Sequence, residues 1–183
     1  MNLWLRLLHL IVASFVRPRL DPARDASRLA FRVWPHDLDT SLHMNNGRYW
    51  TLMDLGRADL MIRSGLWRAV LRHGWTPVVS AGKIRFRREL KAFRSFRLES
   101  RIVAWAETWF VIEHRLVTAA RDGSDILSAI ALVRAGLYDR KAKEFVPVAR
   151  MFAEIGLAEA ASPEPTPEVA AFLEAEEALK QAA

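Results

Sequence analysis

Residues 36–46 of this 183-residue chain bring together two aspartates, two histidines and two asparagines: His36-Asp37-Leu38-Asp39-Thr40-Ser41-Leu42-His43-Met44-Asn45-Asn46. A pattern typical of a helix starts at the last of these residues. The first backbone N–H groups of a helix lack partners inside the helix, and the helix dipole favours negative charge there. The segment therefore offers a carboxylate that can attack or act as a base, next to donors that can stabilise an oxyanion. The asparagines are also ordinary helix caps, and an aspartate here can simply organise a turn.

Other common catalytic sites find little support. The chain has no cysteine, which removes thiolate nucleophiles, disulfides and cysteine metal sites. Residues 78–82 lack the leading glycine of a nucleophile elbow, and the sequence contains no glycine-rich phosphate loop. The five histidines have no close ligand spacing, so we expect no metal site. They are His9, His36, His43, His73 and His114. We also expect no organic cofactor.

Composition describes a globular protein with a basic surface. Hydrophobic residues make up 51% and charged residues 26% of the chain, whose length fits one domain. The net charge of +6 should attract anions such as a phosphorylated cofactor, anionic lipid or nucleic acid. Nucleic acid is not an expected partner, because the aromatic residues recur in core-like positions. The absence of cysteine favours a reducing cytoplasm.

The spacing of apolar residues predicts one long helix and several strands. Residues 29–34 alternate as a first strand does, and residues 46–64 have apolar side chains at intervals of three and four, with Gly65 able to end the helix. Further on the period changes to two, which predicts strands over residues 83–87, 96–104, 111–118 and 126–133, with a hairpin turn at Asp122-Gly123. We expect an α+β fold in which a meander of antiparallel strands curls around the helix.

Both ends of the chain carry additional predicted helices. Residues 3–16 are apolar apart from Arg6 and His9, and such a run is too short to span a bilayer, which needs about 20 residues. Two interpretations stay open: a peripheral contact of residues 1–17 with the inner membrane face, or a helix packed on the domain. After a proline-rich link, a last weakly amphipathic helix is expected to dock on the core. We divide the chain into an N-terminal amphipathic helix (1–19), a main domain (20–150) and a C-terminal helical extension (151–183).

The loop and the following helix resemble a known family. Its pattern is an Asp-x-Asp pair, a histidine, one or two asparagines and a tyrosine, then an acid and an arginine on the helix. Here these residues are Asp37, Asp39, His43, Asn45, Asn46, Tyr49, Asp54 and Arg57. The segment resembles the 4-hydroxybenzoyl-CoA thioesterase-like branch of the hotdog superfamily, and more closely the thioesterase-superfamily-member-6-like proteins. The resemblance covers residues 29–138.

This resemblance implies a hotdog fold, in which a curved antiparallel sheet wraps a long central helix. It also implies a homodimer whose two sheets become continuous, with active sites between the subunits, and tetramers of two dimers are common in the family. The substrate would be an acyl-CoA whose CoA part rests near basic residues. Lys83, Arg85 and Arg87 are the candidates here.

The same resemblance implies roles for the loop. Asp39 matches the catalytic carboxylate, which would attack the thioester carbonyl or deprotonate a water molecule. The backbone N–H of Asn46 or Gly47 would bind the carbonyl oxygen, and His43 would bond the substrate or steady the loop. Asp37 is expected to stabilise the loop.

The helix supplies the remaining candidates. Asp54 is a reserve catalytic acid, although an ion pair with Arg57 three residues later is the simpler explanation. Asn45, Tyr49 and Arg57 are candidate substrate-binding residues. Leu42 stands where many members have glycine, and its bulk would narrow the acyl site or alter the loop. The sequence predicts an acyl-CoA thioesterase, with a non-catalytic acyl- or lipid-binding protein at the membrane surface as the alternative.

Overall fold

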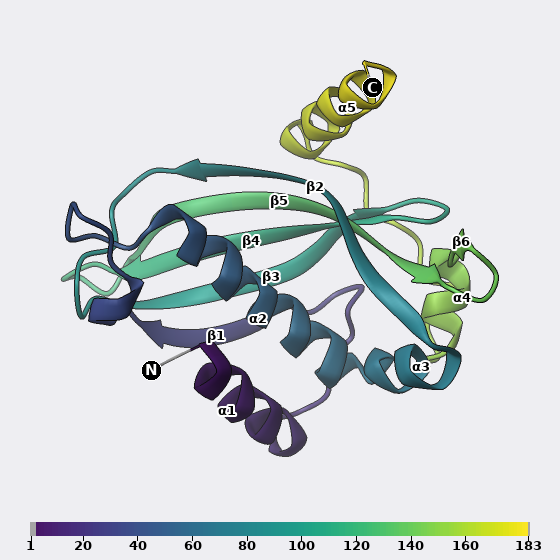
Figure 1. The fold of residues 1–183 in the computed structure, drawn as a ribbon, viewed down its shortest axis with the longest axis horizontal. Helices are drawn as coiled ribbons and strands as arrows, with labels where there is room; N and C mark the ends of the chain where they lie inside the picture. Colours follow the sequence, from purple (N-terminus) through teal and green to yellow (C-terminus); the bar gives the residue numbers. More distant parts are fainter. Residues whose placement is uncertain (1–2, 183) are drawn as a thin grey trace.

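A long helix, α2 (Asn46–Ser64), lies across the concave face of a curved antiparallel sheet in the computed structural model, which describes residues 3–182 (Figure 1). The helix has both of its predicted ends. The Asn45 side chain caps the start by accepting a hydrogen bond from the backbone N–H of Gly47. Gly65 ends the helix in the left-handed conformation, with φ 86°, which a residue without a Cβ adopts at no steric cost.

The sheet contains every predicted strand, in the spatial order β1-β3-β4-β5-β2, with a short β6 beside β5. The strands are β1 (Ser27–Arg32), β2 (Trp75–Phe86), β3 (Ser95–Trp105), β4 (Phe110–Ala119), β5 (Asp125–Asp139) and β6 (Glu144–Phe145). All neighbours are antiparallel. The expected meander is confirmed for β3, β4 and β5 and is wrong for β2. That strand precedes β3 in the chain but pairs with β5, whose apolar residues on both faces suit a covered position.

The core lies between α2 and the sheet. Leu52 and Met53 of α2 are fully buried, as are Leu98 of β3 and Leu116 of β4, and all belong to one apolar cluster. A second cluster closes the other end of the molecule beneath α3 (Leu66–His73) and α4 (Val148–Ala153). The two clusters hold α2 along most of its length, so its start has a fixed position relative to the sheet.

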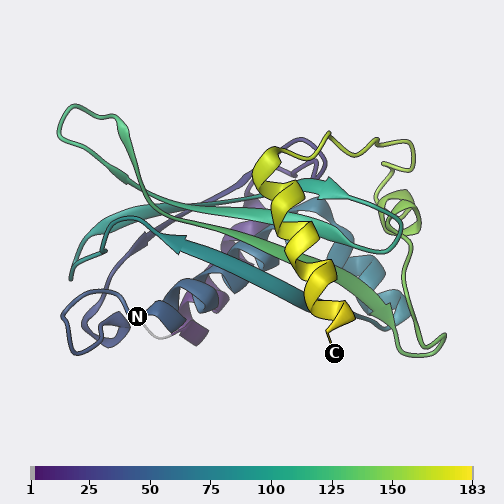
Figure 2. The same ribbon diagram turned by 90° about the horizontal axis from the view of Figure 1, so that it is seen from above.

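The last helix, α5 (Pro167–Gln181), lies on the opposite face of the sheet from α2 (Figure 2). Its Val169 and Phe172 are buried against the strands, and Glu176 pairs with Arg134 at 2.7 Å. The predicted docking of this helix on the core is confirmed. The first helix, α1 (Leu3–Val16), packs along α2. None of the described helices combines the length and the apolar character needed to cross a bilayer.

Candidate active site

The loop before α2 is a closed turn. The backbone N–H of Asn45 donates to the carbonyl of Asp37 at 2.9 Å, and the N–H of Asp39 donates to the carbonyl of His43 at 3.0 Å. The base of the turn is fixed to the chain that follows β2, because the N–H of Met44 donates to the Leu90 carbonyl at 2.9 Å. The polar side chains of the loop are therefore carried on a backbone whose own hydrogen bonds are largely satisfied.

Asp37 anchors this turn, as predicted. Its side chain is 1% exposed and accepts hydrogen bonds from Arg6 at 3.2 and 2.6 Å and from the backbone N–H of Trp34 at 2.9 Å. Arg48, in the first turn of α2, lies 3.6 Å away. A buried carboxylate needs such partners to stay charged, and here they join α1, the loop and α2.

Asp39 has the more accessible carboxylate. Its Oδ1 accepts a hydrogen bond from the backbone N–H of Ser41 at 2.9 Å, and its Oδ2 lies 3.3 Å from Nδ1 of His43. The side chains of Asp39 and His43 remain 23% and 33% exposed. The aspartate thus organises the turn and also presents an oriented carboxylate beside a histidine.

The start of α2, which follows this turn directly, offers one open donor. The backbone N–H of Gly47 is occupied, because it donates to Oδ1 of Asn45 at 2.8 Å. The N–H of Asn46 has no hydrogen-bond partner among residues 3–182. The structure therefore narrows the two predicted oxyanion donors to Asn46, and it gives Asn45 the capping role that its residue type favours.

Tyr49 and Phe86 close the inner side of the loop. Burial raises the pKa of Tyr49 to about 12; a hydrogen bond with the Leu90 backbone opposes this rise, and the nearby carboxylates of Asp39 and Glu89 add to it. The ring of Phe86 meets the Tyr49 ring edge-on at 4.9 Å. Tyr49 therefore stays protonated at neutral pH and serves as a wall of the site.

Two of the three basic candidates, Lys83 and Arg85, point away from α2. Ile84 packs against the core cluster beneath α2, and Phe86 touches Tyr49. Since side chains alternate along a strand, Lys83 and Arg85 project from the opposite face, where both are exposed. The third candidate, Arg87, is exposed and follows the end of β2.

A cationic cleft lies closer to the loop. Its wall follows the turn between β2 and β3, and that turn pairs with the loop through a backbone bridge between His43 and Lys91. The basic residues that line it are Arg87, Arg88, Lys91 and Arg94. The sequence shows the density of positive charge here, and the bridge shows that the backbone of Lys91 lies beside that of His43.

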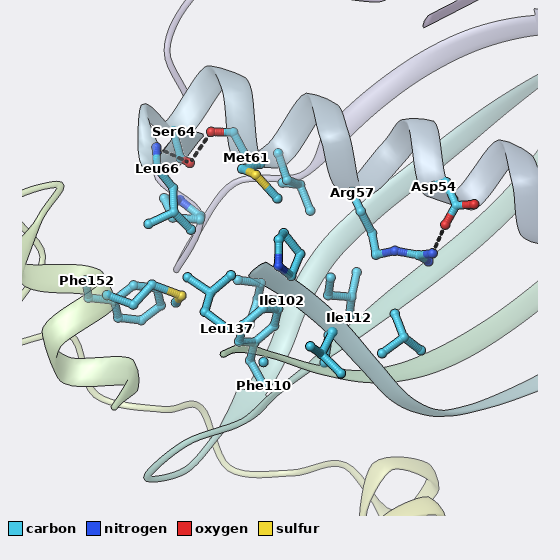
Figure 3. Close-up of a pocket in the computed structure, with 18 residues that line it drawn as sticks. Asp54, Arg57, Met61, Ser64, Leu66, Ile102, Phe110, Ile112, Leu137 and Phe152 are labelled. Atoms are coloured by element: carbon cyan, nitrogen blue, oxygen red, sulfur yellow. Dashed lines mark hydrogen bonds and ion pairs between the residues drawn. The ribbon is translucent and has the colours of Figure 1, made fainter. Parts of the chain in front are cut away.

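The other half of α2 borders an apolar cavity of about 210 Å³ (Figure 3). Asp54 and Arg57 stand at one edge of it and form the predicted ion pair. The labelled apolar side chains come from α2, α3, α4 and three strands: Met61, Leu66, Phe152, Ile102, Phe110, Ile112 and Leu137. Such a lining suits an aliphatic or aromatic group.

A buried polar chain lies behind this ion pair. Nε2 of His114 is 3.4 Å from the Arg57 guanidinium, and its Nδ1 is 2.8 Å from Oγ of Ser100. Arginine only donates, so Nδ1 carries the proton and donates to Ser100. Burial, and then the Arg57 charge, lowers the pKa of His114 well below its usual range. Gly56 makes room for this chain, because a Cβ there would lie 2.2 Å from the serine oxygen.

The structure brings some of the predicted site residues together and separates others. Asp39, His43, Asn45, Asn46, Gly47 and Tyr49 meet at the start of α2. Asp54 and Arg57 lie at the cavity, and about 12 Å of helix separates Asn46 from Asp54. Ser100 and His114 were not among the predicted residues, because only the pairing of β3 with β4 places them opposite each other.

This architecture is that of the hotdog fold, as solved structures confirm. The chain superimposes on the probable thioesterase YbaW of Escherichia coli with a TM-score of 0.63, at 19% identity, covering 73% of this chain and 98% of that one. The 4-hydroxybenzoyl-CoA thioesterase of Pseudomonas sp. strain CBS-3 gives a TM-score of 0.62 at 18% identity, covering 71% and 98%. The fold prediction is therefore confirmed.

The family follows from the sequence. The family model of the thioesterase-like superfamily matches residues 33–171, and the chain belongs to this superfamily. Protein THEM6 of Xenopus laevis is 38% identical over 102 residues, covering 56% of this chain and 48% of that protein. Protein THEM6 of Danio rerio is 42% identical over 103 residues, covering 56% and 50%. The chain thus matches about half the length of these relatives, and the predicted resemblance is confirmed.

Proposed function

We propose that this protein is an acyl-CoA thioesterase whose chemistry takes place at the loop before α2. One observation carries the proposal: the carboxylate of Asp39 and the unpartnered N–H of Asn46 belong to one closed turn at the start of a buried helix. Membership of the thioesterase-like superfamily supports this type of reaction.

In the proposed reaction, the thioester carbonyl oxygen accepts a hydrogen bond from Asn46, whose position at the helix start favours negative charge. Asp39 attacks the carbonyl carbon, so that the C–S bond breaks and an acyl–Asp39 anhydride forms, which water then hydrolyses to the acid and free Asp39. Alternatively, Asp39 takes a proton from a water molecule that attacks the carbonyl carbon and displaces the sulfur. In both routes water supplies one oxygen to the acid and the proton with which the sulfur leaves as a thiol. His43, held against Asp39 at 3.3 Å, orients the carboxylate.

The phosphates of CoA have a matching surface beside the loop. Arg87, Arg88, Lys91 and Arg94 line the cationic cleft, and the backbone of Lys91 pairs with that of His43. Phosphate oxygens bind guanidinium groups in charge-assisted hydrogen bonds, and salt screens such contacts when they are exposed. We therefore expect KM for acyl-CoA to rise with ionic strength.

The active unit of this proposal is a homodimer formed through β2. This strand is the edge of the sheet, and Val79 and Phe86 are 50% and 41% exposed along it. A long edge strand with apolar side chains is a template for pairing with another chain. A twofold axis at this edge would lay the two strands antiparallel, so that the loop of one copy approaches the cavity of the other.

A non-catalytic acyl-binding protein is the second candidate. Both Asp39 oxygens already have partners within the chain, as they would in a purely structural turn. The apolar cavity would then hold an acyl group without cleaving it. The absence of cysteine suits a reducing compartment, so for either function we propose a cytoplasmic location.

Release of free thiol from short, medium and long aliphatic and aromatic acyl-CoAs tests the proposal. Asp39→Asn, which keeps the side-chain shape, should lower kcat/KM by about 100-fold to 10,000-fold. Asp122→Asn in the exposed β4–β5 turn is the matched control and should leave activity unchanged. Turnover that survives Asp39→Asn would refute the assigned role. Tight acyl-CoA binding without turnover by the wild type would establish the second candidate.

A further inference from the structure

Helix α1 docks on the protein through a mixed face, on which buried Leu10 lies between two buried polar residues. Arg6 and Ser14 are 4% and 6% exposed. Arg6 bonds both oxygens of buried Asp37, and Oγ of Ser14 donates to Oδ1 of buried Asp59 at 3.1 Å. Because breaking a buried ion pair is costly, these contacts prevent the helix from rolling about its axis.

The outward face of α1 is apolar as a consequence. Six side chains on it are more than half exposed: Trp4, Leu5, Leu8, Val12, Phe15 and Val16. With 3.6 residues per turn they cover an arc of about 120° that contains no charged residue. Contiguous exposed apolar side chains are unfavourable in water, so we expect this outer arc to be a binding surface.

A recess rich in arginine adjoins the outer arc at the end of α1. Phe15 of the arc meets Trp67 of α3 edge-on at 6.4 Å, and both rings help to line the recess. Its four cations are Arg17, Arg19, Arg63 and Arg68, and the described residues that line it include no acid. Arg17 and Arg63 pair with buried Asp59 behind the wall.

Two of these cations are available to a ligand. Among residues 3–182, neither Arg19 nor Arg68 forms an ion pair, and both are exposed. The apolar arc and the positive charge therefore lie side by side on one surface. A second copy that pairs through this same face is a poor occupant, since its own exposed Arg19 and Arg68 would lie on the facing surface.

We propose that the outer arc and the arginine recess together bind the surface of an anionic phospholipid membrane. The apolar side chains would enter the boundary between headgroups and acyl chains, while the recess binds lipid phosphate. Helix α1 has 14 residues and is held to the domain along its inner face, so it would lie in the plane of the membrane. The inference does not depend on the proposed thioesterase activity.

Co-sedimentation of the full chain with vesicles tests this inference. Vesicles of phosphatidylglycerol mixed with phosphatidylcholine should bind the wild type at least tenfold more tightly than vesicles of phosphatidylcholine alone. Leu8→Gln combined with Val12→Gln should weaken binding at least tenfold, because both side chains face solvent and contribute only to the membrane contact. Arg19→Glu combined with Arg68→Glu should abolish the preference for the anionic lipid.

Leu71→Gln and Leu179→Gln are the controls, since these leucines are 71% and 72% exposed on other helices. Both controls should bind vesicles as the wild type does, and thermal unfolding should show that all variants fold. The inference is overturned if the wild type does not bind anionic vesicles. It is also overturned if the arc variant, Leu8→Gln combined with Val12→Gln, binds them as tightly as the wild type does. Light scattering that shows a smaller oligomer for the arc variant would assign the arc to a second copy and also overturn it.

Discussion

The two ends of helix α2 differ in what they offer a substrate. At its start, Asn45, Asn46 and Gly47 are exposed, and a carboxylate lies beside an open backbone donor. Its later half borders an apolar cavity, where the polar groups already satisfy one another through Arg57, His114 and neighbouring residues. The first region has the groups for a reaction, and the second has the space for an acyl group.

Under the proposed function, the separation of these regions would leave a single copy without a complete site. The helix is rigid and packed on both core clusters, so bending cannot bring its two ends together. Antiparallel pairing of β2 across a twofold axis would place the start of one α2 beside the later half of the other. The proposed active site therefore uses residues of two copies.

The largest expected effect comes from breaking the pairing. Val79→Glu places a charge near the middle of the exposed edge of β2, where two copies would repel each other. We expect the dimer dissociation constant to rise by about 100-fold or more, with a parallel loss of activity at low protein concentration. Analytical ultracentrifugation measures the association. Leu179→Glu, on α5, should change neither property, and a fully active Val79→Glu monomer would contradict the shared site.

A smaller effect should follow from filling the cavity. Met61 lines it and is only partly buried, so Met61→Trp can occupy the space with little damage to the core. We expect kcat/KM for long-chain acyl-CoA to fall about tenfold, since each lost methylene contact contributes about 0.8 kcal/mol. Met61→Leu, which keeps the volume, is the control. An unchanged chain-length profile for Met61→Trp would place the acyl group elsewhere.

The buried His114 should affect stability and its pH dependence. Its pKa is lowered in the folded state, so below about pH 6.5 the unfolded chain binds a proton that the folded chain does not. This contribution to stability is present above that pH and is lost as the pH falls, at up to about 1.4 kcal/mol per unit. Urea unfolding of His114→Gln should show about 2 kcal/mol lower stability at pH 8 and a flatter acid dependence. An unaltered dependence would show that His114 is not responsible.

The smallest expected effect is that of Leu42→Gly on the stability of the fold. It adopts φ 60°, a conformation that costs a residue with a Cβ about 1–2 kcal/mol, and its side chain is 71% exposed. A positive φ suits glycine better than leucine, and the Leu42 side chain points outward within one copy. We expect Leu42→Gly to stabilise the fold by about 1 kcal/mol in thermal unfolding. Thr40→Gly, where φ is not positive, should stabilise nothing; equal effects of the two changes would remove the strain argument.

Local signals predicted α2 well but described the edge of the sheet poorly. Asn45 and Gly65 mark the two ends of the helix because capping and left-handed conformations depend on residue type alone. In β2 the alternation of side chains marked only residues 83–87, and residues 78–82 were interpreted as strand residues without a clear period. Pro77 and Gly82 interrupt the alternating pattern, although an edge strand tolerates both residues. β1 begins at Ser27, two residues before its predicted start. A polar residue is not expected in a buried strand position, but the Ser27 hydroxyl is buried and donates to Asp59 at 2.6 Å.

Local sequence patterns likewise predicted only part of the candidate site. The loop acids and the cap were predictable because they are close together in the chain. The contact of His114 with Ser100 and Arg57 depends on strand register and on how α2 crosses the sheet. The cationic cleft likewise depends on the bridge between His43 and Lys91, which no local pattern indicates.

Mixing two impaired variants tests most directly whether one site uses residues of two copies. Asp39→Asn lacks the carboxylate but keeps an open cavity, whereas Met61→Trp keeps the carboxylate, narrows the cavity and retains about a tenth of the activity on long-chain acyl-CoA. Random exchange makes about half of the dimers mixed, each with one complete site. With a long-chain acyl-CoA we therefore predict about a quarter of wild-type activity after the subunits are unfolded and refolded together, against about a twentieth for the same amounts of the two variants kept apart. A mixture that forms dimers but is no more active than the two variants kept apart would contradict a site shared between copies.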